Sequence, residues 1–116
     1  MNFWDFEYLN IPMNNNGIFE LDNVYDEKWK NVYSIQLTKE DVENIDSLIN
    51  DFNSTFNIII DLAEEEQLLN ENLQPALILA KKRFEVASDK VKPSIQKVID
   101  AINKAIEFNT FVEFDL

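Results

Sequence analysis

The sequence predicts an α+β fold, in which amphipathic helices pack on a small antiparallel sheet. Apolar residues recur every three or four positions through the middle of the chain, and every second position near both ends. These are the periods of half-buried helices and half-buried strands. The length of 116 residues and the hydrophobic content of 46% suit one globular domain, so we expect residues 1–116 to form a single domain.

The predicted strands come from the first 37 residues and the C-terminal tail. Trp4, Phe6 and Tyr8 alternate with acidic residues, which is typical of a strand with one buried face. The tract IPMNNNG follows, and its proline, asparagines and glycine favour a loop. We expect the tail strand to lie beside the N-terminal ones. The predicted strands are residues 4–8, 18–21, 32–37 and 112–116.

Three helices are predicted between these strands, at about 39–66, 75–88 and 93–107. Thr38 and Asp41 are spaced as a capping box, which satisfies the free amides of a first helical turn. Pro75 suits the first position of the second helix. The first helix is predicted to be the longest because its apolar stripe continues without a miss through Val42, Ile45, Ile49, Phe52, Phe56, Ile59 and Ala63.

The charge of this chain is unevenly distributed. The formal net charge is −12 at pH 7, and residues 40–80 contain ten acidic and no basic residues. A solvated helix usually alternates signs, because Glu–Lys pairs four residues apart stabilise it by about 0.2–0.5 kcal/mol each. The acids of IIIDLAEEEQ (residues 58–67) lack such partners nearby in the sequence. Lys81, Lys82 and Arg83 are candidates to fold back against them.

Two interpretations of these acids follow: a solvated or internally paired face, or a surface that contacts a partner. We favour the second, because full pairing with residues 81–83 still leaves the long helix net negative. A field of this sign attracts basic proteins and repels nucleic acids and anionic lipids. The residues predicted to contact the partner are Asp61, Glu64, Glu65, Glu66 and Glu71, extended by Glu43 and Asp46.

The residue inventory argues against catalysis. There is no cysteine or histidine, so the usual nucleophile–base pairs and most metal sites cannot be built. Gly17 is the only glycine, which excludes glycine-rich phosphate loops. No spacing singles out a pair of carboxylates or a calcium loop. We predict a protein that is not an enzyme and has no catalytic, cofactor or metal site.

Two aromatic residues in the polar segment DNVYDEKWKN have two possible roles. Tyr25 and Trp29 could anchor a partner surface, or they could cover the open end of the core.

The location of the protein is predicted from other features. The start MNFWDFEYLN lacks the basic and apolar parts of a secretory signal, and no apolar run approaches the ~20 residues of a membrane span. We expect a cytoplasmic protein that does not bind membranes.

In size, charge and carboxylate-rich segments such as DLAEEEQLLNENL, the chain resembles the immunity proteins of bacterial toxin systems, including those of contact-dependent growth inhibition. The resemblance implies a cognate toxin domain as partner, often a nuclease with a basic active-site groove. Carboxylates would then occupy that groove in place of nucleic-acid phosphates.

Two other classes of function stay open. A mimic of DNA would carry acids at duplex-like spacing of ~1.7 Å per charge along an axis, and few exposed bases. The seven bases between residues 81 and 107 argue against such a mimic. A subunit-interaction module without inhibitory activity is the other alternative. The oligomeric state does not follow from the sequence.

Overall fold

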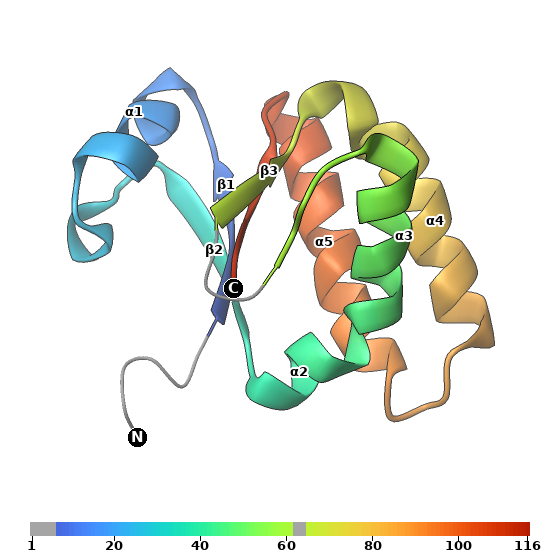
Figure 1. Cartoon of the computed structure of the whole chain (residues 1–116). Helices are drawn as coiled ribbons and strands as arrows, with labels where there is room; N and C mark the ends of the chain where they lie inside the picture. The colour runs from blue at the N-terminus through green and yellow to red at the C-terminus, as the bar shows by residue number, and fades with distance from the viewer. Residues whose placement is uncertain (1–6, 62–64) are drawn as a thin grey trace.

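The computed structural model describes residues 7–61 and 65–116 as an α+β fold (Figure 1). Its strands are β1 (Glu7–Pro12), β2 (Val32–Leu37), β3 (Glu65–Leu68) and β4 (Val112–Asp115). Its α-helices are α1 (Asn15–Asn23), α2 (Lys39–Asn44), α3 (Asp46–Phe56), α4 (Leu73–Val86) and α5 (Lys92–Phe108). Short 3₁₀ helices lie at η2 (Asp26–Lys28) and η3 (Asn70–Asn72).

Within the described residues, the strands form one antiparallel sheet in the order β2-β1-β4-β3. The tail strand β4 lies between the N-terminal strand β1 and the edge strand β3. Alternation along each strand gives the sheet two faces. Leu9, Ile11, Val112, Phe114 and Leu68 lie on the inner face and are buried to 0% exposure, so this face carries the core.

The helices α5 and α3 lie over the inner face of the sheet, and α4 packs against both of them (Figure 1). The long helix α5 packs against β1, β2 and β4 through a row of fully or nearly fully buried side chains: Ile95, Val98, Ile99, Ile102 and Ala105. From α3, Phe52 reaches Phe114 of β4 edge to face, with ring centroids 6.3 Å apart. One hydrophobic core therefore joins the sheet to all three helices.

The outer face of the sheet is polar. Two rows of aligned residues cross its four described strands: Gln36, Tyr8, Asp115 and Glu65, and Ser34, Asn10, Glu113 and Gln67. The connection between β1 and β2, which contains α1 and η2, lies on this side of the sheet (Figure 1). Gly17 of α1 is buried because this connection closes tightly. A Cβ atom there would lie 2.2 Å from the Asn31 carbonyl oxygen.

Several predicted elements are confirmed. The strand predicted at 32–37 is β2, and the tail strand predicted at 112–116 is β4. The helices predicted at 75–88 and 93–107 are α4 and α5, with ends that differ by one or two residues. The N-terminal strand predicted at 4–8 is confirmed only in part. Strand β1 covers Glu7–Pro12, and Trp4 and Phe6 lie outside the described residues. The predicted buried face is wrong at Tyr8, which lies on the outer face beside Gln36 and Asp115, because Leu9 and Ile11 fill the core instead.

The strand predicted at 18–21 is wrong, because these residues belong to helix α1. The asparagine-rich tract, predicted to be a loop, starts this helix instead. The side chain of Asn14 accepts a hydrogen bond from the amide of Gly17 at 3.0 Å, which is the geometry of an N-cap.

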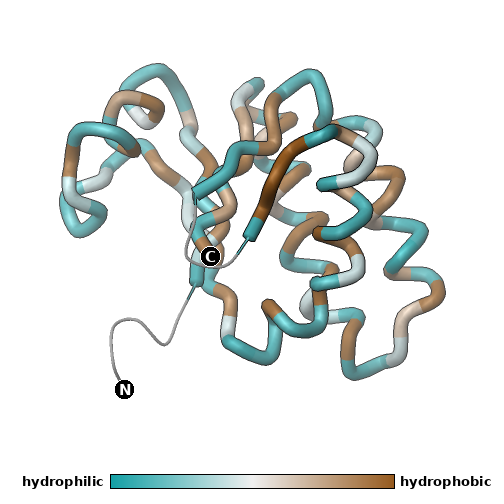
Figure 2. Tube along the Cα trace, in the orientation of Figure 1, coloured by the Kyte–Doolittle hydropathy of each residue, from teal (hydrophilic) through white to brown (hydrophobic). Residues whose placement is uncertain are grey.

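The long helix predicted at 39–66 is also wrong as a single element. It breaks at Ile45 (φ −96°, ψ 3°) into α2 and α3, and α3 ends at Asn57 in the left-handed conformation (φ 53°). The three β-branched isoleucines 58–60 then run beside α3 as an extended apolar segment, drawn brown in Figure 2. The apolar residues from Val42 to Phe56 keep a spacing of three or four across Ile45, so the stripe does not reveal the break.

No helix among residues 7–61 and 65–116 is long and apolar enough to span a membrane.

Candidate functional site

The helix pair α2–α3 carries acidic residues on two different sides. On one side, Glu40, Asp41 and Asp51 form ion pairs with basic residues of α4, of α5 and of the turn between them. On the other side, Glu43 and Asp46 face a groove beside the extended segment 58–61. The two sides therefore have different chemical roles, which the geometry below defines.

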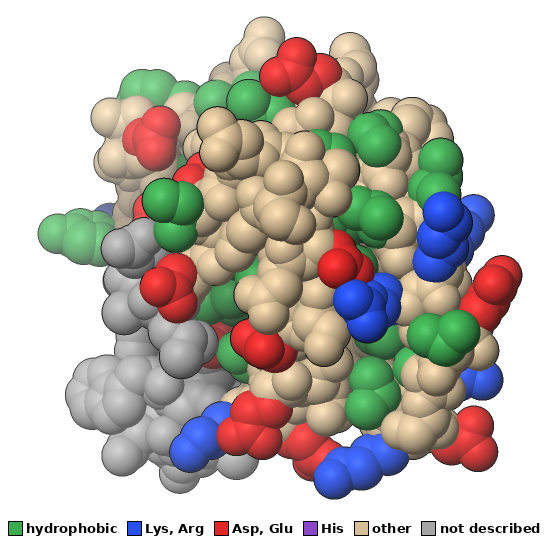
Figure 3. Space-filling view, turned by 45° about the vertical axis from the view of Figure 1, so that its right-hand side comes forward, with side chains coloured by type: hydrophobic (Ala, Val, Ile, Leu, Met, Phe, Trp, Pro, Cys, Tyr) green, Lys and Arg blue, Asp and Glu red, His purple; other side chains and the backbone are tan. Residues whose placement is uncertain are grey.

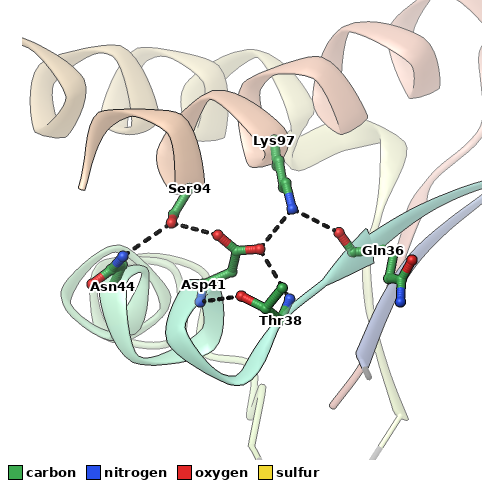
Figure 4. Close-up of polar contacts among 6 residues, drawn as sticks. All are labelled: Gln36, Thr38, Asp41, Asn44, Ser94 and Lys97. Carbon is green, nitrogen blue, oxygen red and sulfur yellow. Dashed lines mark hydrogen bonds and ion pairs between the residues drawn. The ribbon is translucent and has the colours of Figure 1, made fainter. Parts of the chain in front are cut away.

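Asp41 is the centre of the paired side (Figure 4). Its carboxylate accepts hydrogen bonds from Lys97 Nζ at 2.6 Å, from Ser94 Oγ at 2.6 Å and from the Thr38 amide at 2.9 Å. Burial alone would raise the pKa of Asp41, but these three donors lower it to about 2. Lys97 also donates to the carbonyl of Gln36, so this network ties α2, α5 and β2 together.

The predicted capping box of Thr38 and Asp41 is confirmed as part of this network. Arg83 forms a two-point ion pair with Asp51, with nitrogen–oxygen distances of 2.6 and 3.0 Å, which lowers the pKa of Asp51. Lys90 contacts Glu40 more loosely, at 3.5 Å between exposed side chains. On this side of α2–α3, the acids Glu40, Asp41 and Asp51 are therefore paired within the molecule.

The other side of α2–α3 forms one wall of a groove of about 510 Å³. The opposite wall is the segment that contains Ile59, Ile60 and Asp61. Buried apolar side chains form the floor: Ile49 and Leu116 are each 6% exposed, and Ile60 is 3% exposed. The acids lie above this floor on exposed positions. The groove is lined by Val42, Glu43, Asp46, Ile49, Asn50, Asn53, Ile59, Ile60, Asp61 and Leu116.

Asn53 holds the two walls of the groove together. Its side-chain amide donates to the Ile60 carbonyl at 3.0 Å and accepts from the Ile60 amide at 2.7 Å. These two hydrogen bonds satisfy the backbone amide and carbonyl of Ile60, as a neighbouring strand would. The groove is thus fixed by the protein itself before anything binds in it.

The structure brings together three of the seven predicted contact residues, Glu43, Asp46 and Asp61. Glu65 and Glu66 lie instead on β3, beside a separate hollow of about 370 Å³. Glu71 is exposed on η3, and Glu64 lies outside the described residues. The prediction that Glu65 and Glu66 lie on the long helix is wrong, because α3 ends at Phe56 and these two residues belong to β3.

Sequence reasoning missed a buried acid on the outer face of the sheet. Glu113 alternates with the apolar residues of the tail strand, which favours a solvent-exposed position, yet it is 5% exposed. Burial and the carboxylates of Glu65, Asp115 and Asp22 raise the pKa of Glu113 to about 7, although a hydrogen bond from Asn10 acts in the opposite sense. Burial and Asp26 likewise raise the pKa of Asp115. The alternation of the strand gave the correct face, but nothing in it signals that the segment around α1 covers this face.

The two aromatic residues of DNVYDEKWKN differ in role. Trp29 is half-buried, and its indole nitrogen donates to the carbonyls of Glu20 and Val24 at 3.0 and 2.9 Å. It therefore fixes the connection between α1 and η2. Tyr25 is 78% exposed and stands free for contact with another molecule.

The distribution of charge is visible on the surface. In Figure 3, Lys and Arg side chains lie mainly along the right-hand and lower edges of the face shown, whereas Asp and Glu are spread across it next to apolar side chains. Within residues 7–61 and 65–116, no group of three or more acidic side chains is arranged to hold a metal ion. The groove combines carboxylates with apolar surface.

No protein-family model, curated protein sequence or solved structure matches this chain. We therefore infer function from the residues and the geometry described above.

Proposed function

We propose that this chain is an acidic binding protein that inhibits a basic partner, and that the partner is a toxin domain neutralised in the manner of an immunity protein. One observation carries the proposal. The acids of α2–α3 divide into a set paired within the molecule and a set, Glu43 and Asp46 with Asp61, that lines a groove. Glu43 and Asp46 lie beside the groove and outside the ion pairs of the described residues, so their carboxylates are placed to meet cations from another molecule.

The inhibitory mechanism follows from the charge. Opposite potentials raise association rate constants towards 10⁸–10⁹ M⁻¹s⁻¹ at low salt, compared with 10⁵–10⁶ for neutral surfaces. The exposed aromatic and aliphatic side chains Tyr25, Phe19 and Ile59 add short-range contacts, since they are 78%, 62% and 66% exposed. A basic active-site groove covered in this way loses access to its anionic substrate. The protein itself carries out no reaction in this proposal.

The test uses the full chain as bait. Bound proteins are retained at low salt, eluted at high salt and identified, and the association rate of the purified basic partner is measured at several salt concentrations. We expect a rate that falls at least about tenfold between 50 and 500 mM salt, because exposed charges are screened over this range. We also expect the partner to be toxic when expressed alone in bacteria and harmless when co-expressed with this chain.

A matched variant tests whether the acids cause the effect. Replacing Glu43, Asp46, Asp61, Glu65, Glu66 and Glu71 together by their amides removes six negative charges with little change in shape. We expect slower association and loss of protection in the co-expression experiment. The proposal fails if no basic protein is retained at low salt, or if binding and protection are unchanged in this variant.

A further inference from the structure

Strand β2 forms one edge of the sheet, at the opposite end from β3 (Figure 1). Among the described strands it pairs only with β1, and this pairing shows which backbone groups of β2 point outward. The amide of Met13 donates to the carbonyl of Asn31 at 2.8 Å, so these two opposite residues form a hydrogen-bonded pair. Such pairs occur at every second position of an antiparallel ladder. The backbone groups of Val32, Ser34 and Gln36 therefore point to the free edge.

Two other contacts agree with this direction. Pro12 lies opposite Val32, where a hydrogen-bonded pair would need the amide hydrogen that proline lacks. The carbonyl of Gln36 accepts a hydrogen bond from Lys97 Nζ at 3.0 Å, from outside the β1–β2 pair. Because Ser34 and Gln36 are exposed, a further strand has access to this edge.

This edge lacks the features that usually keep the edges of sheets apart. Charged side chains, prolines and bulges commonly protect an edge strand from pairing with another molecule. Strand β2 reads VYSIQL, without a charge or a proline, and it pairs with β1 in continuous register. Strands β1, β3 and β4 each contain at least one acid. In a chain of net charge −12, β2 is thus the described strand on which a second copy pairs without placing acids opposite acids.

The sequence of β2 also complements itself. Antiparallel pairing about a two-fold axis at Ser34 places Ser34 opposite its own copy, and Tyr33 opposite Ile35 of the second copy. Both Tyr33 and Ile35 lie on the inner face of the sheet, because their partners in β1 are Ile11 and Leu9. Aromatic and β-branched side chains are a favourable cross-strand pair. This register therefore covers the ring of Tyr33, which is 40% exposed in the single chain.

The surface beside Tyr33 carries charges of both signs. A hollow of about 310 Å³ lies between this ring and α5, and Asp100, Lys104 and Glu107 line it. The Lys104 Nζ atom is 5.3 Å from the centroid of the Tyr33 ring and 3.2 Å from the Glu107 carboxylate. A two-fold axis beside this hollow brings the cation of each copy towards the acids of the other. Charge at this edge therefore attracts a second copy as well as repelling it.

We infer that β2 is an interaction surface for a second copy of this chain, which pairs antiparallel with it about an axis at Ser34. The two sheets then form one continuous sheet with the β2 strands at its centre. The groove between α2–α3 and residues 58–61 is a different surface, so this inference does not rest on the proposed function. A single strand pair is a small contact, and interfaces below about 1,200 Å² are weak. We expect a dissociation constant on the order of 100 μM.

A first experiment measures association of the full chain. Sedimentation equilibrium is recorded from about 10 μM to about 1 mM protein in about 0.5 M salt, which screens the repulsion between two acidic copies. We expect monomer at the lowest concentration and mainly dimer at the highest. In a mixture of isotope-labelled and unlabelled chains, NMR should detect nuclear Overhauser effects between Tyr33 and Ile35 of different copies. A monomer at every concentration, or a dimer without this contact, would overturn the inference.

Variants test the position of the axis. Ser34→Lys and Ser34→Glu each place like charges opposite one another, so each should weaken dimerisation at least tenfold. Ser54→Lys, on an exposed position of α3, makes the same change of charge away from β2 and should leave dimerisation unchanged. An equal mixture of Ser34→Lys and Ser34→Glu should dimerise again, because opposite charges then meet across the axis.

This recovery separates pairing from a general loss of structure. The Ser34 hydroxyl donates to the side chain of Asn10 at 2.8 Å, so folding of both Ser34 variants is checked by circular dichroism. Folded variants that dimerise like the wild type, or that do not recover on mixing, would contradict an axis at Ser34. If the variants do not fold, the contact between Tyr33 and Ile35 in the wild type decides the matter.

Discussion

Asp41 and Glu113 are both buried carboxylates, with 9% and 5% of their surface exposed, but they lie in opposite surroundings. Asp41 lies between α2 and α5, where Lys97, Ser94 and the Thr38 amide donate to it. Glu113 lies on the outer face of the sheet among other carboxylates, with a hydrogen bond from Asn10. The pKa of Asp41 falls to about 2, and that of Glu113 rises to about 7.

This difference shows that acidic composition alone does not assign a role to a carboxylate. Burial raises the pKa of both carboxyl groups, and the neighbours decide whether donors and cations offset this effect. Asp41 stabilises the fold, whereas the ionised form of Glu113 destabilises it. Glu43 and Asp46 occupy a third environment, on exposed positions beside the groove.

Removing the Asp41 carboxylate should have the largest effect on stability. Asp41→Ala breaks the capping box and leaves Lys97 and Ser94 without their acceptor. The loss of a cap and of a partly buried ion pair predicts a fall of about 3 kcal/mol in the free energy of unfolding. Urea denaturation at pH 7 measures it. Glu40→Ala is the matched control, because the neighbouring Glu40 makes only a loose, exposed contact. A similar loss in both variants would contradict the assignment.

The same carboxylate should make the protein acid-sensitive. Its pKa is about 2 in the folded state and 3.8 ordinarily, so its contribution is complete above about pH 5. As pH falls from 5 towards 2, about 2 kcal/mol of stability should be lost, because the unfolded chain takes up the proton first. Urea denaturation of the wild type and Asp41→Asn across this range should show the difference between them shrinking. A constant difference would contradict the pKa assignment.

Glu113→Gln should change stability in the opposite direction. The folded-state pKa of about 7 lies above the ordinary 4.5, so ionisation of Glu113 costs stability as pH rises from about 4.5 to 7. The amide removes this cost, and we expect a gain of about 3 kcal/mol at pH 8 and almost none at pH 4. Thermal or urea unfolding at both pH values measures it. Glu85→Gln, on the exposed surface of α4, should give no pH-dependent gain. A destabilised Glu113→Gln at pH 8 would sink this interpretation.

The covering of Glu113 by the segment around α1 depends on the close approach at Gly17. In Gly17→Ala the new methyl carbon would lie 2.2 Å from the Asn31 carbonyl oxygen. The clash costs about 2–3 kcal/mol, and the better helix propensity of alanine returns about 1, so we expect a net loss of about 1–2 kcal/mol. Glu113 should also titrate closer to its ordinary pKa in this variant, which carboxyl NMR measures. If both the stability and the pKa of Glu113 stay unchanged, the burial of Glu113 does not depend on the close approach at Gly17.

Local signals in the sequence were sufficient for part of the fold. The alternation in Val32–Leu37, the Thr38–Asp41 spacing and the stripes of α4 and α5 all act within a few residues, and each is confirmed. The single long helix failed because the spacing of three and four continues across Ile45, where the backbone leaves the helical conformation. The signal for its true end was present in Asn57 and the three β-branched isoleucines that follow it.

The candidate site was predictable only in its residue types. The surplus of acids in residues 40–80 singled out Glu43, Asp46 and Asp61, but their convergence needs the chain to turn at Asn57 and return beside α3. The burial of Glu113 needs a cover from residues nearly a hundred positions away. Such contacts are non-local, so no periodicity in the sequence encodes them.

The smallest effect on stability is expected at the groove, and it completes the comparison. Glu43→Gln/Asp46→Asn should change the free energy of unfolding by no more than about 0.5 kcal/mol, as for exposed surface substitutions. Asp46 lies in the first turn of α3, where its charge favours the helix dipole by a few tenths of a kcal/mol. Relief of repulsion between the acids offsets part of that loss. Urea denaturation of this variant and of Asp41→Ala under the same conditions compares their free energies of unfolding. A loss above about 1 kcal/mol would place these acids with Asp41, as part of the fold and not of a binding surface.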